Sequence, residues 1–240
     1  MIQKEINKIQ KKFGRTIAAG NLINDNDKIL IGLSGGKDSL TLTDLLYQKQ
    51  KYYPVKFSLY AAYIEIAGIG EVTDIEYLSK FCCSREIPLF IKKNDVNFNS
   101  DLDKCYNCST SKRKVLFDLC KELNCGKLAL GHNLDDNIET ILLNMFYQGR
   151  ISGICSKLNI FNGNLEIIRP LLDISENEIE TYVRLKGLIT NTGKCRYSYE
   201  NSRNNVKEII AQLAENNDKV KYNIKNSISN VKYFNQNTIN

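Results

Sequence analysis

A strand, a glycine-bearing loop and a helix follow one another early in the chain. The apolar run 29–33 predicts a buried strand, residues 34–39 read Ser-Gly-Gly-Lys-Asp-Ser, and leucines then recur over 40–46 at helical spacing. Such a turn directs backbone N–H groups and the positive end of a helix dipole at one point, which suits a phosphate. This segment constrains the fold most, because a strand that leads directly into a helix is the repeating unit of parallel α/β sheets.

The loop differs from the common P-loop. The motif G-x-x-x-x-G-K-[ST] would need glycine in place of Ile31 and Ser or Thr in place of Asp38. Lys37 adds positive charge, and Ser34 and Ser39 add hydroxyl donors. A carboxylate beside a polyphosphate is explained best as a magnesium ligand, so the loop predicts Mg²⁺ as well as phosphate. An ordinary βα turn is the alternative, since Gly-Gly and Ser-Gly are common turn formers.

Strands and helices alternate along the rest of the first two thirds of the chain. Further strands are expected at 57–66, 88–91 and 128–130, with helices between and after them, and residues 93–108 read as polar and irregular. This order predicts an α/β fold, a doubly wound parallel sheet with helices on both faces. An N-terminal helix precedes the sheet, and a C-terminal helical extension follows it.

We expect three regions in the 240 residues: an N-terminal helix at 1–25, a nucleotide-binding domain at 26–172, and a C-terminal helical region at 173–240. Ligands of such sheets lie beyond the carboxyl ends of the strands. The loop 34–39 and the turn 131–136 both follow strands, so both should face the same crevice.

Composition limits the setting of the protein. The first residues lack the apolar core of a signal peptide, and no stretch is long enough to cross a bilayer, so we expect a cytoplasmic protein without membrane contact. Its eight cysteines would stay reduced there and be able to bind metal or act as nucleophiles. The net charge of +6 is a mild indication of a polyanionic partner such as nucleic acid.

Three cysteines could hold a metal centre. Cys105 and Cys108 form a C-x-x-C pair, which serves zinc, iron–sulfur and redox chemistry alike. Cys195 is flanked by Lys194 and Arg196, and a basic setting favours the thiolate. The three thiolates would leave one position of a metal site open, although spacing alone leaves unrelated cysteines as the alternative. Of the others, we expect a core position for Cys82, Cys83 and Cys120, while Cys125 and Cys155 stay open.

The turn after the fourth strand is acidic. Asn133, Asp135 and Asp136 read either as an N-cap with first-turn acids or, for Asp136, as a carboxylate that points into the crevice. His132, the only histidine, is equally explained as a turn residue and as a catalytic one. The basic run Lys112-Arg113-Lys114 is either a solvated helix face or a contact for ATP or RNA phosphate.

These motifs together resemble a known family. Ser34-Gly35-Gly36-Lys37-Asp38-Ser39 is similar to the PP-loop of the N-type ATP pyrophosphatases, which have a PP-loop/HUP-like Rossmannoid fold. With Cys105-x-x-Cys108, Gly131-His132-Asn133-Leu134-Asp135-Asp136 and Cys195, the chain resembles the TtcA/TtuA family of tRNA 2-thiolation enzymes from its N-terminal helix to about residue 235. The combination is far more specific than the loop, which several subfamilies share.

The resemblance implies a 4Fe-4S cluster on Cys105, Cys108 and Cys195, with the fourth iron free to carry sulfide. It also implies ATP on the loop 34–39, a catalytic role for Asp136 beside the magnesium ligand Asp38, and binding residues outside the loop, which are Ile64, Gly131 and Lys112. The implied reaction adenylates the C2 oxygen of a tRNA pyrimidine, releases pyrophosphate, and then replaces AMP by sulfur. The implied partners are tRNA and a sulfur donor, such as a cysteine desulfurase or a sulfur-carrier protein, and a homodimer stays open.

The target nucleotide is not determined by the motifs. Residues 65–71, His132-Asn133 and 195–198 are more similar to the TtuA branch, which acts on a uridine. The compact ends and residues 144–147 are more similar to the TtcA branch, which acts on a cytidine.

Three other functions fit parts of the sequence. A PP-loop thiolase could use Cys105 and Cys195 as a persulfide relay without a cluster. A non-catalytic ATP-binding regulator would have no use for Asp38 and Asp136, and a lysidine-synthetase-like ligase would have no use for the three cysteines.

Overall fold

The structure is a computed structural model that describes residues 2–66, 73–94, 104–190, 202–217 and 219–230. The chain forms two compact units. The first comprises residues 1–134 and 155–199, and the second comprises residues 135–154 and 200–240. The three-region division expected from the sequence, with borders near 25 and 172, stays a prediction.

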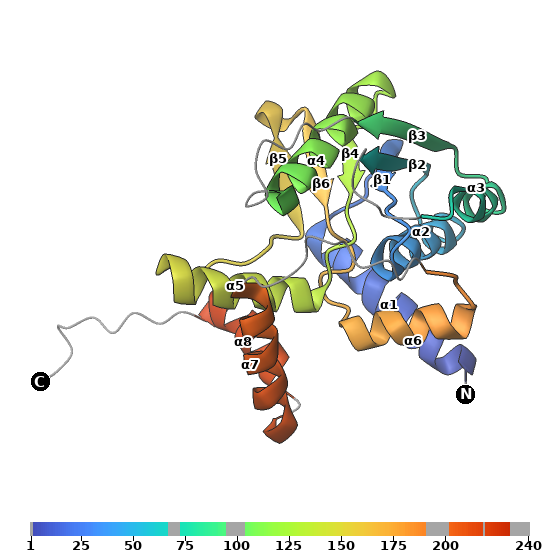
Figure 1. Ribbon diagram of the computed structural model, residues 1–240. Coiled ribbons are helices and arrows are strands. Elements are labelled where there is room, and N and C mark those ends of the chain that lie inside the picture. Colours follow the sequence, from blue (N-terminus) through green and yellow to red (C-terminus); the bar gives the residue numbers. More distant parts are fainter. Residues whose placement is uncertain (1, 67–72, 95–103, 191–201, 218, 231–240) are drawn as a thin grey trace, which may run out of the picture. The chain divides into compact units, whose positions relative to one another are not determined.

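The first unit contains one six-stranded sheet with the order β3-β2-β1-β4-β6-β5 (Figure 1). Its strands are β1 (Asp27–Gly32), β2 (Phe57–Ile66), β3 (Leu89–Asn94), β4 (Lys127–Ala129), β5 (Lys157–Ile160) and β6 (Leu165–Ile168). The expected strand at 57–66 is confirmed in full, and those at 29–33, 88–91 and 128–130 are confirmed within a few residues.

The sheet is not parallel throughout. β5 pairs antiparallel with β6, whereas the other neighbouring strands pair parallel. The sequence did not predict this hairpin, because both strands are only four residues long. Its connection, Phe161–Gly163, reverses the chain with the left-handed backbone of Asn162 (φ 56°) and Gly163 (φ 87°).

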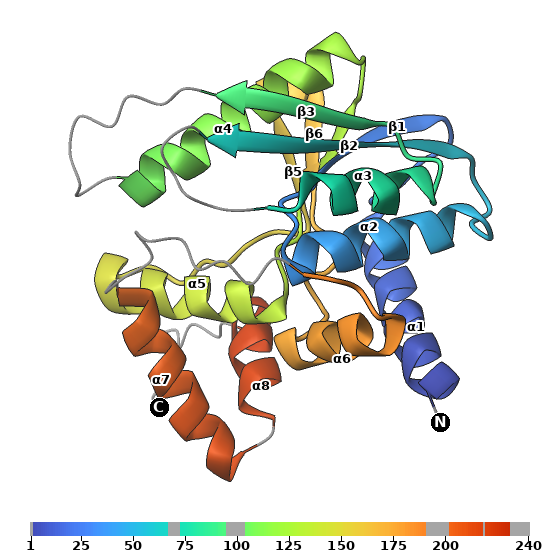
Figure 2. The same ribbon diagram turned by 45° about the vertical axis from the view of Figure 1, so that its right-hand side comes forward.

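Helices cover both faces of this sheet, as expected (Figure 2). On one face lie α1 (Ile2–Gly20), α2 (Lys37–Gln50), α3 (Ile75–Cys83) and α6 (Glu176–Lys186), and on the other lies α4 (Lys104–Glu122). The alternation of a strand explains the two layers: in β1, Ile29 and Ile31 pack with the first group of helices and Leu30 packs with α4. All three side chains are fully buried.

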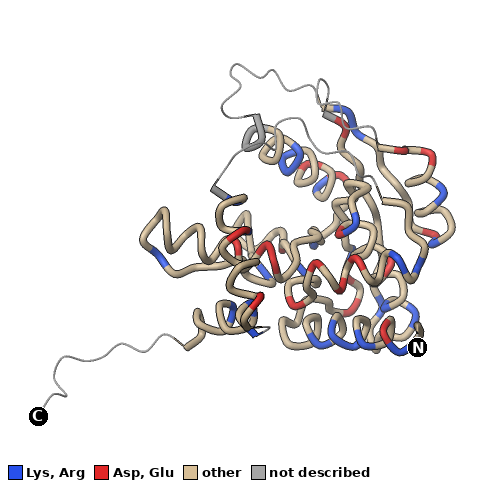
Figure 3. The backbone as a smooth tube through the Cα atoms, turned by 60° about the horizontal axis from the view of Figure 1, so that its bottom comes forward, with Lys and Arg blue, Asp and Glu red and all other residues tan. Residues whose placement is uncertain are grey.

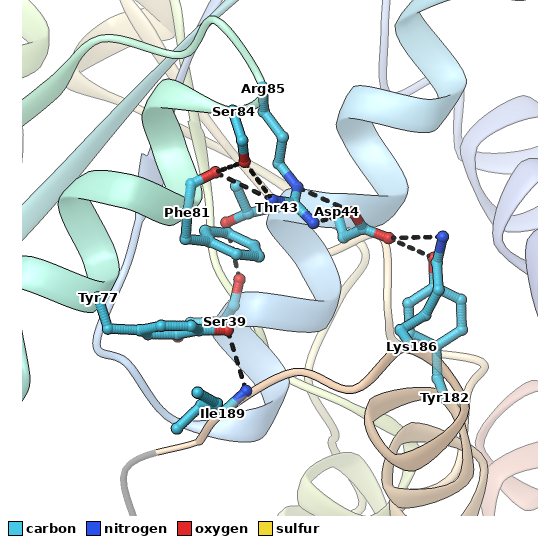
Figure 4. A network of polar contacts seen from close by, with 10 residues as sticks. All are labelled: Ser39, Thr43, Asp44, Tyr77, Phe81, Ser84, Arg85, Tyr182, Lys186 and Ile189. Carbon is cyan, nitrogen blue, oxygen red and sulfur yellow. Dashed lines mark hydrogen bonds and ion pairs between the residues drawn. The ribbon is translucent and has the colours of Figure 1, made fainter.

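A buried carboxylate joins three elements of the first unit (Figure 4). Asp44 on α2 is 1% exposed and accepts hydrogen bonds from Arg85 Nε (2.8 Å) and Nη2 (2.7 Å), just beyond α3. Its other oxygen accepts a hydrogen bond from the Tyr182 hydroxyl of α6 (2.6 Å) and lies 3.6 Å from Lys186 Nζ. Burial and the charge of Asp44 raise the pKa of Tyr182, so this hydroxyl remains a donor. The network fixes α6 along α2.

The second unit is helical. It contains α5 (Leu134–Gln148) from its second residue on, α7 (Ser202–Asn216), α8 (Val220–Ser227) and a short 3₁₀ turn, Ile228–Asn230. Asn137 Oδ1 accepts a hydrogen bond from the backbone N–H of Ile154 (2.7 Å), and Lys221 on α8 pairs with Asp135 on α5. Within the described ranges, no helix is both long and apolar enough to cross a membrane.

Candidate nucleotide site at the carboxyl ends of the strands

The loop 34–39 is held in shape by its own serines. Ser39 Oγ lies 3.1 Å from Ser34 Oγ, accepts from the Ser34 backbone N–H (3.1 Å) and donates to the Gly36 carbonyl (3.0 Å). Gly35 has a φ of 81°, a left-handed conformation that glycine adopts without a steric cost. The two hydroxyls, expected to be phosphate donors, therefore also organise the loop.

The helix that follows presents an uncapped amino end. α2 begins at Lys37 after Gly36, whose N-cap position makes no side-chain hydrogen bond. The first N–H groups of a helix have no partner within the helix, and its dipole favours negative charge there. This end of α2 is therefore suited to a phosphate, as the sequence predicted.

The turn after β4 packs directly on this loop. Asn133 Nδ2 donates to Asp38 Oδ1 (3.0 Å), so Asn133, which read as an N-cap, orients the predicted magnesium ligand. A Cβ atom at Gly131 would lie 3.2 Å from the backbone carbon of Asp38 and 3.3 Å from the Ser39 nitrogen. Gly131 thus permits a close approach of two backbones, which explains a glycine there.

Lys37 has a partner that the sequence analysis missed. Its Nζ lies 2.7 Å from Glu176 Oε1, at the start of α6, and 3.5 Å from Asp38 Oδ2. Burial by itself lowers the pKa of Lys37, but the Glu176 hydrogen bond and the Asp38 charge outweigh it and raise the pKa above 10.5. Lys37 is therefore a permanent cation. No local pattern marks Glu176, because the contact depends on how α6 packs against α2.

A hollow of about 350 Å³ opens beside the loop, which is within the range of small-molecule sites. It is lined by the ends of β1 and β2, by one side of α4 and by the turn after β4. The lining residues are Gly32, Leu33, Ser34, Ala62, Tyr63, Ile64, Ser109, Lys112, Arg113, Leu116, Leu130 and His132. The predicted nucleoside contact Ile64 and the predicted phosphate contact Lys112 thus line one space beside the loop.

A larger hollow of about 610 Å³ lies away from the loop, between the end of α4 and the start of β6. Phe117, Gly126 and Leu165 are among its lining residues. We favour the smaller hollow as the nucleotide site, because ligands of parallel sheets bind beyond the carboxyl ends of the strands.

Two further predicted groups have a defined place. In the basic run, Lys112 and Arg113 line the smaller hollow, whereas Lys114 is exposed and does not line it. Asp136 lies in the second unit, in the first turn of α5, where Thr140 Oγ1 donates to its backbone carbonyl (2.8 Å). The expectation that Asp136 faces the loop 34–39 stays a proposal.

The C-x-x-C pair lies inside a helix. We expected Cys105 and Cys108 in an irregular segment ahead of a helix, but α4 begins at Lys104 and includes both. Cys108 is half-buried, while Cys195 and the side chain of Cys105 lie outside the described residues. No group of three metal-binding side chains occurs within the described part of the chain.

The remaining cysteines divide into core and surface residues. Cys82 and Cys120 are buried, as expected, and so is Cys125, which the sequence left open. Burial raises the pKa of Cys120 to about 12 and that of Cys125 to about 11, so both stay thiols. The expectation of a core position was wrong for Cys83, which is exposed because it falls on the outer side of α3. Cys155 is also exposed.

Comparison with known proteins assigns the chain to a family. The family model described as a PP-loop domain matches residues 2–214. The tRNA-cytidine(32) 2-sulfurtransferase of Syntrophotalea carbinolica is 34% identical over 216 residues, which cover 87% of this chain and 83% of that protein. The protein of the same name from Aliivibrio fischeri is 36% identical over 220 residues, with coverages of 87% and 71%. The chain belongs to the PP-loop family, in the branch of the tRNA 2-thiolation enzymes.

Solved structures agree with this PP-loop assignment. The U34-tRNA thiolase NcsA from Methanococcus maripaludis, with its [4Fe-4S] cluster, matches with a TM-score of 0.80 and 27% identity over 96% of this chain and 82% of that one. An NH3-dependent NAD synthetase from Campylobacter jejuni matches with a TM-score of 0.51 and 15% identity over 96% and 92% of the two chains, a likeness of fold. The PP-loop fold and the family resemblance expected from the sequence are both confirmed.

Proposed function

We propose that this protein is an ATP-dependent tRNA sulfurtransferase that replaces the C2 oxygen of a pyrimidine by sulfur. The observation that carries the proposal is that the hollow reaches Ser34 of the PP-loop and His132 of the turn, beside the uncapped start of α2 and the Asp38–Asn133 contact. The sulfurtransferases among the relatives support the substrate class. The proposed reaction converts ATP to AMP and pyrophosphate.

ATP is proposed to lie with its nucleoside in the hollow and its phosphates on the PP-loop. The Ile64 and Gly131 backbones would contact the nucleoside, and Lys112 the phosphates. Lys37 and the first N–H groups of α2 supply positive charge where the pyrophosphate leaves. Asp38, held by Asn133, would bind Mg²⁺ beside the phosphate oxygens, where the ion neutralises charge.

The reaction then has two displacements. The pyrimidine C2 oxygen attacks the α-phosphorus of ATP; the new O–P bond forms as the bond to pyrophosphate breaks, and pyrophosphate leaves. This step converts a poor oxygen leaving group into a good one. A sulfide equivalent from the sulfur donor then attacks C2, the C2–O bond breaks, and AMP leaves with the oxygen. Asp136 is proposed to be the catalytic acid of this sequence.

The cysteine set is consistent with an iron–sulfur cluster. Three thiolates and no fourth ligand are the donor set of a 4Fe-4S cluster with one open iron, and iron–sulfur sites use C-x-x-C pairs such as Cys105-x-x-Cys108. When bound, the cluster would supply an iron that presents sulfide. Cys195 is proposed to be the third ligand. The cluster in the NcsA structure supports this reading over a Cys105/Cys195 persulfide relay.

Lysine and arginine residues recur along α1 (Figure 3), and they support a tRNA substrate. Lys4, Lys8, Lys11 and Arg15 are exposed on α1 at helical intervals, opposite the apolar side of that helix, which is buried. Phosphate contacts of this kind supply most of the affinity for nucleic acid and fix its position. We propose cytidine as the target, because the relatives that are 34% and 36% identical act on a cytidine by name. The neighbour named for U34 is 27% identical.

The proposal is tested with nucleosides and with the cluster. Mass spectrometry of tRNA from cells that lack the gene should show loss of 2-thiocytidine. Loss of a 2-thiouridine derivative would refute the choice of cytidine, and an unchanged profile would refute the function.

Anaerobic reconstitution with iron and sulfide should give a visible cluster absorbance that Cys108→Ser abolishes. The exposed Cys83 offers a matched control, and Cys83→Ser should keep the absorbance. A colourless protein with full activity would refute the cluster. The sulfur donor, a cytoplasmic location and a homodimer stay untested expectations.

A further inference from the structure

The ammonium of the PP-loop lysine lies against a carboxylate from a distant part of the chain. Lys37 Nζ is 2.7 Å from Glu176 Oε1, and the two side chains are 28% and 37% exposed. Lys37 is the only lysine in the loop 34–39, and its charge is the one that the loop can offer a leaving pyrophosphate. Glu176 is therefore the nearest competitor of any polyphosphate for that charge.

Glu176 is fixed by the start of α6. Ser175 is the N-cap, and it forms a capping box in which Glu178 accepts from the Ser175 backbone N–H (2.8 Å) and Ser175 Oγ accepts from the Glu178 N–H. Lys12 on α1 lies 2.7 Å from Glu178, and Tyr182 on the same helix donates to Asp44. These contacts hold the backbone of Glu176 in place when its side chain loses Lys37.

A polyphosphate and the carboxylate affect each other at this ammonium in two ways. An ammonium has three N–H donors, so each contact that it makes with Glu176 is one that it does not make with phosphate. The carboxylate also repels a neighbouring phosphate, because like charges a few ångström apart raise each other's energy. In the proposed binding mode, contacts of the nucleoside in the hollow offset this repulsion for ATP. Pyrophosphate has no nucleoside, so nothing offsets the repulsion after the bond to the α-phosphorus breaks.

We infer that Glu176 is a positioning residue that competes with the polyphosphate for Lys37 and thereby promotes the release of pyrophosphate. This inference rests on the proposed function, since it concerns the product of the adenylation step. The role proposed for Glu176 is indirect, because its contact is with the Lys37 ammonium. It acts through Lys37, which returns to the carboxylate when the product leaves.

Calorimetric titration of magnesium pyrophosphate into the full-length protein tests the inference. Because partly exposed ion pairs are weak, Glu176→Gln should bind pyrophosphate about two- to tenfold more tightly than the wild type. In turnover with ATP and tRNA, this variant should show a lower KM for ATP and a lower kcat, with stronger inhibition by added pyrophosphate. Glu176→Asp keeps the charge and should lie between the two proteins.

Glu180→Gln on the same helix is the matched control, since Glu180 is exposed and forms no ion pair among those found in the described residues. It should bind pyrophosphate as the wild type does. A Glu176→Gln variant that binds pyrophosphate no more tightly than the wild type would overturn the inference and leave the proposed function intact. A wild-type protein that binds neither ATP nor pyrophosphate would refute the proposed function and the inference with it.

Discussion

Replacing Asp44 by alanine should destabilise the first unit strongly. Asp44 is 1% exposed, and the substitution removes the carboxylate that accepts two hydrogen bonds from Arg85 and one from Tyr182. The Arg85 side chain is only 15% exposed, so its charge would stay largely buried without its partner. Breaking a buried ion pair in this way costs about 3–5 kcal/mol. In a protein of this size, that corresponds to a fall in Tm on the order of 10 °C.

Thermal and urea unfolding followed by circular dichroism would measure the effect, with Glu76→Ala as the control. Glu76 pairs with Lys80 four residues away, and both side chains are more than 70% exposed, so its loss should cost less than about 0.5 kcal/mol. A triple variant, Asp44→Leu with Arg85→Met and Tyr182→Phe, should regain most of the lost stability, because it leaves neither a buried charge nor a buried hydroxyl without its partner. If Asp44→Ala unfolds at the temperature of the control, the network does not hold α6 on α2.

Three further outcomes are expected. Gly131→Ala should raise the KM for ATP by about tenfold, because the new methyl group displaces the PP-loop backbone. The circular dichroism spectrum should stay unchanged, and an unchanged KM would contradict this prediction. Burial by itself raises the pKa of Glu178, but its hydrogen bonds outweigh this and lower the pKa below 4.5, so the stability that it supplies is present at neutral pH and is lost as the pH falls. In urea unfolding at pH 7, the free energy of unfolding of Glu178→Gln should accordingly be about 1 kcal/mol lower than that of the wild type. This difference between the two proteins should close below pH 4.5. A difference that stays constant with pH would show a structural role independent of charge. The double variant Lys8→Gln with Lys11→Gln should weaken tRNA binding in filter assays and reduce the slope of log affinity against log salt by about 1 to 2, whereas Lys80→Gln should leave both unchanged.

The part of the fold that follows from local sequence was predictable. β2 is ten residues of almost continuous apolar and aromatic character, a pattern that is typical of a strand buried on both faces of a sheet. Its bounds were predicted as the structure has them. The β5–β6 hairpin was not predictable, since Leu158 in β5 is exposed and a four-residue strand offers too few positions for a pattern. The start of α4 was missed because residues 104–108 are polar and cysteine-rich, so their helical state has no apolar periodicity to reveal it.

The candidate site divides in the same way. Residues 34–39 were predicted from local sequence because a turn that brings backbone to phosphate requires glycine and small polar residues. Gly131 was predicted as a binding residue only through the family resemblance. Glu176 was missed because its partner Lys37 lies far away along the chain, and an ordinary first-turn acid looks the same in a sequence. Asn133 was interpreted as a possible cap, and its hydrogen bond to Asp38 could not be predicted because it depends on how the turn packs on the loop.

The path of the chain through the two units has a consequence for biosynthesis. The second unit is made of two separate stretches, residues 135–154 and residues 200–240. Residues 155–199, which belong to the first unit, are translated between them. The apolar side of α5, with Ile138 and Ile141, therefore leaves the ribosome well before α7 and α8 exist to complete its unit. Until α7 and α8 follow, α5 lacks the other helices of its unit.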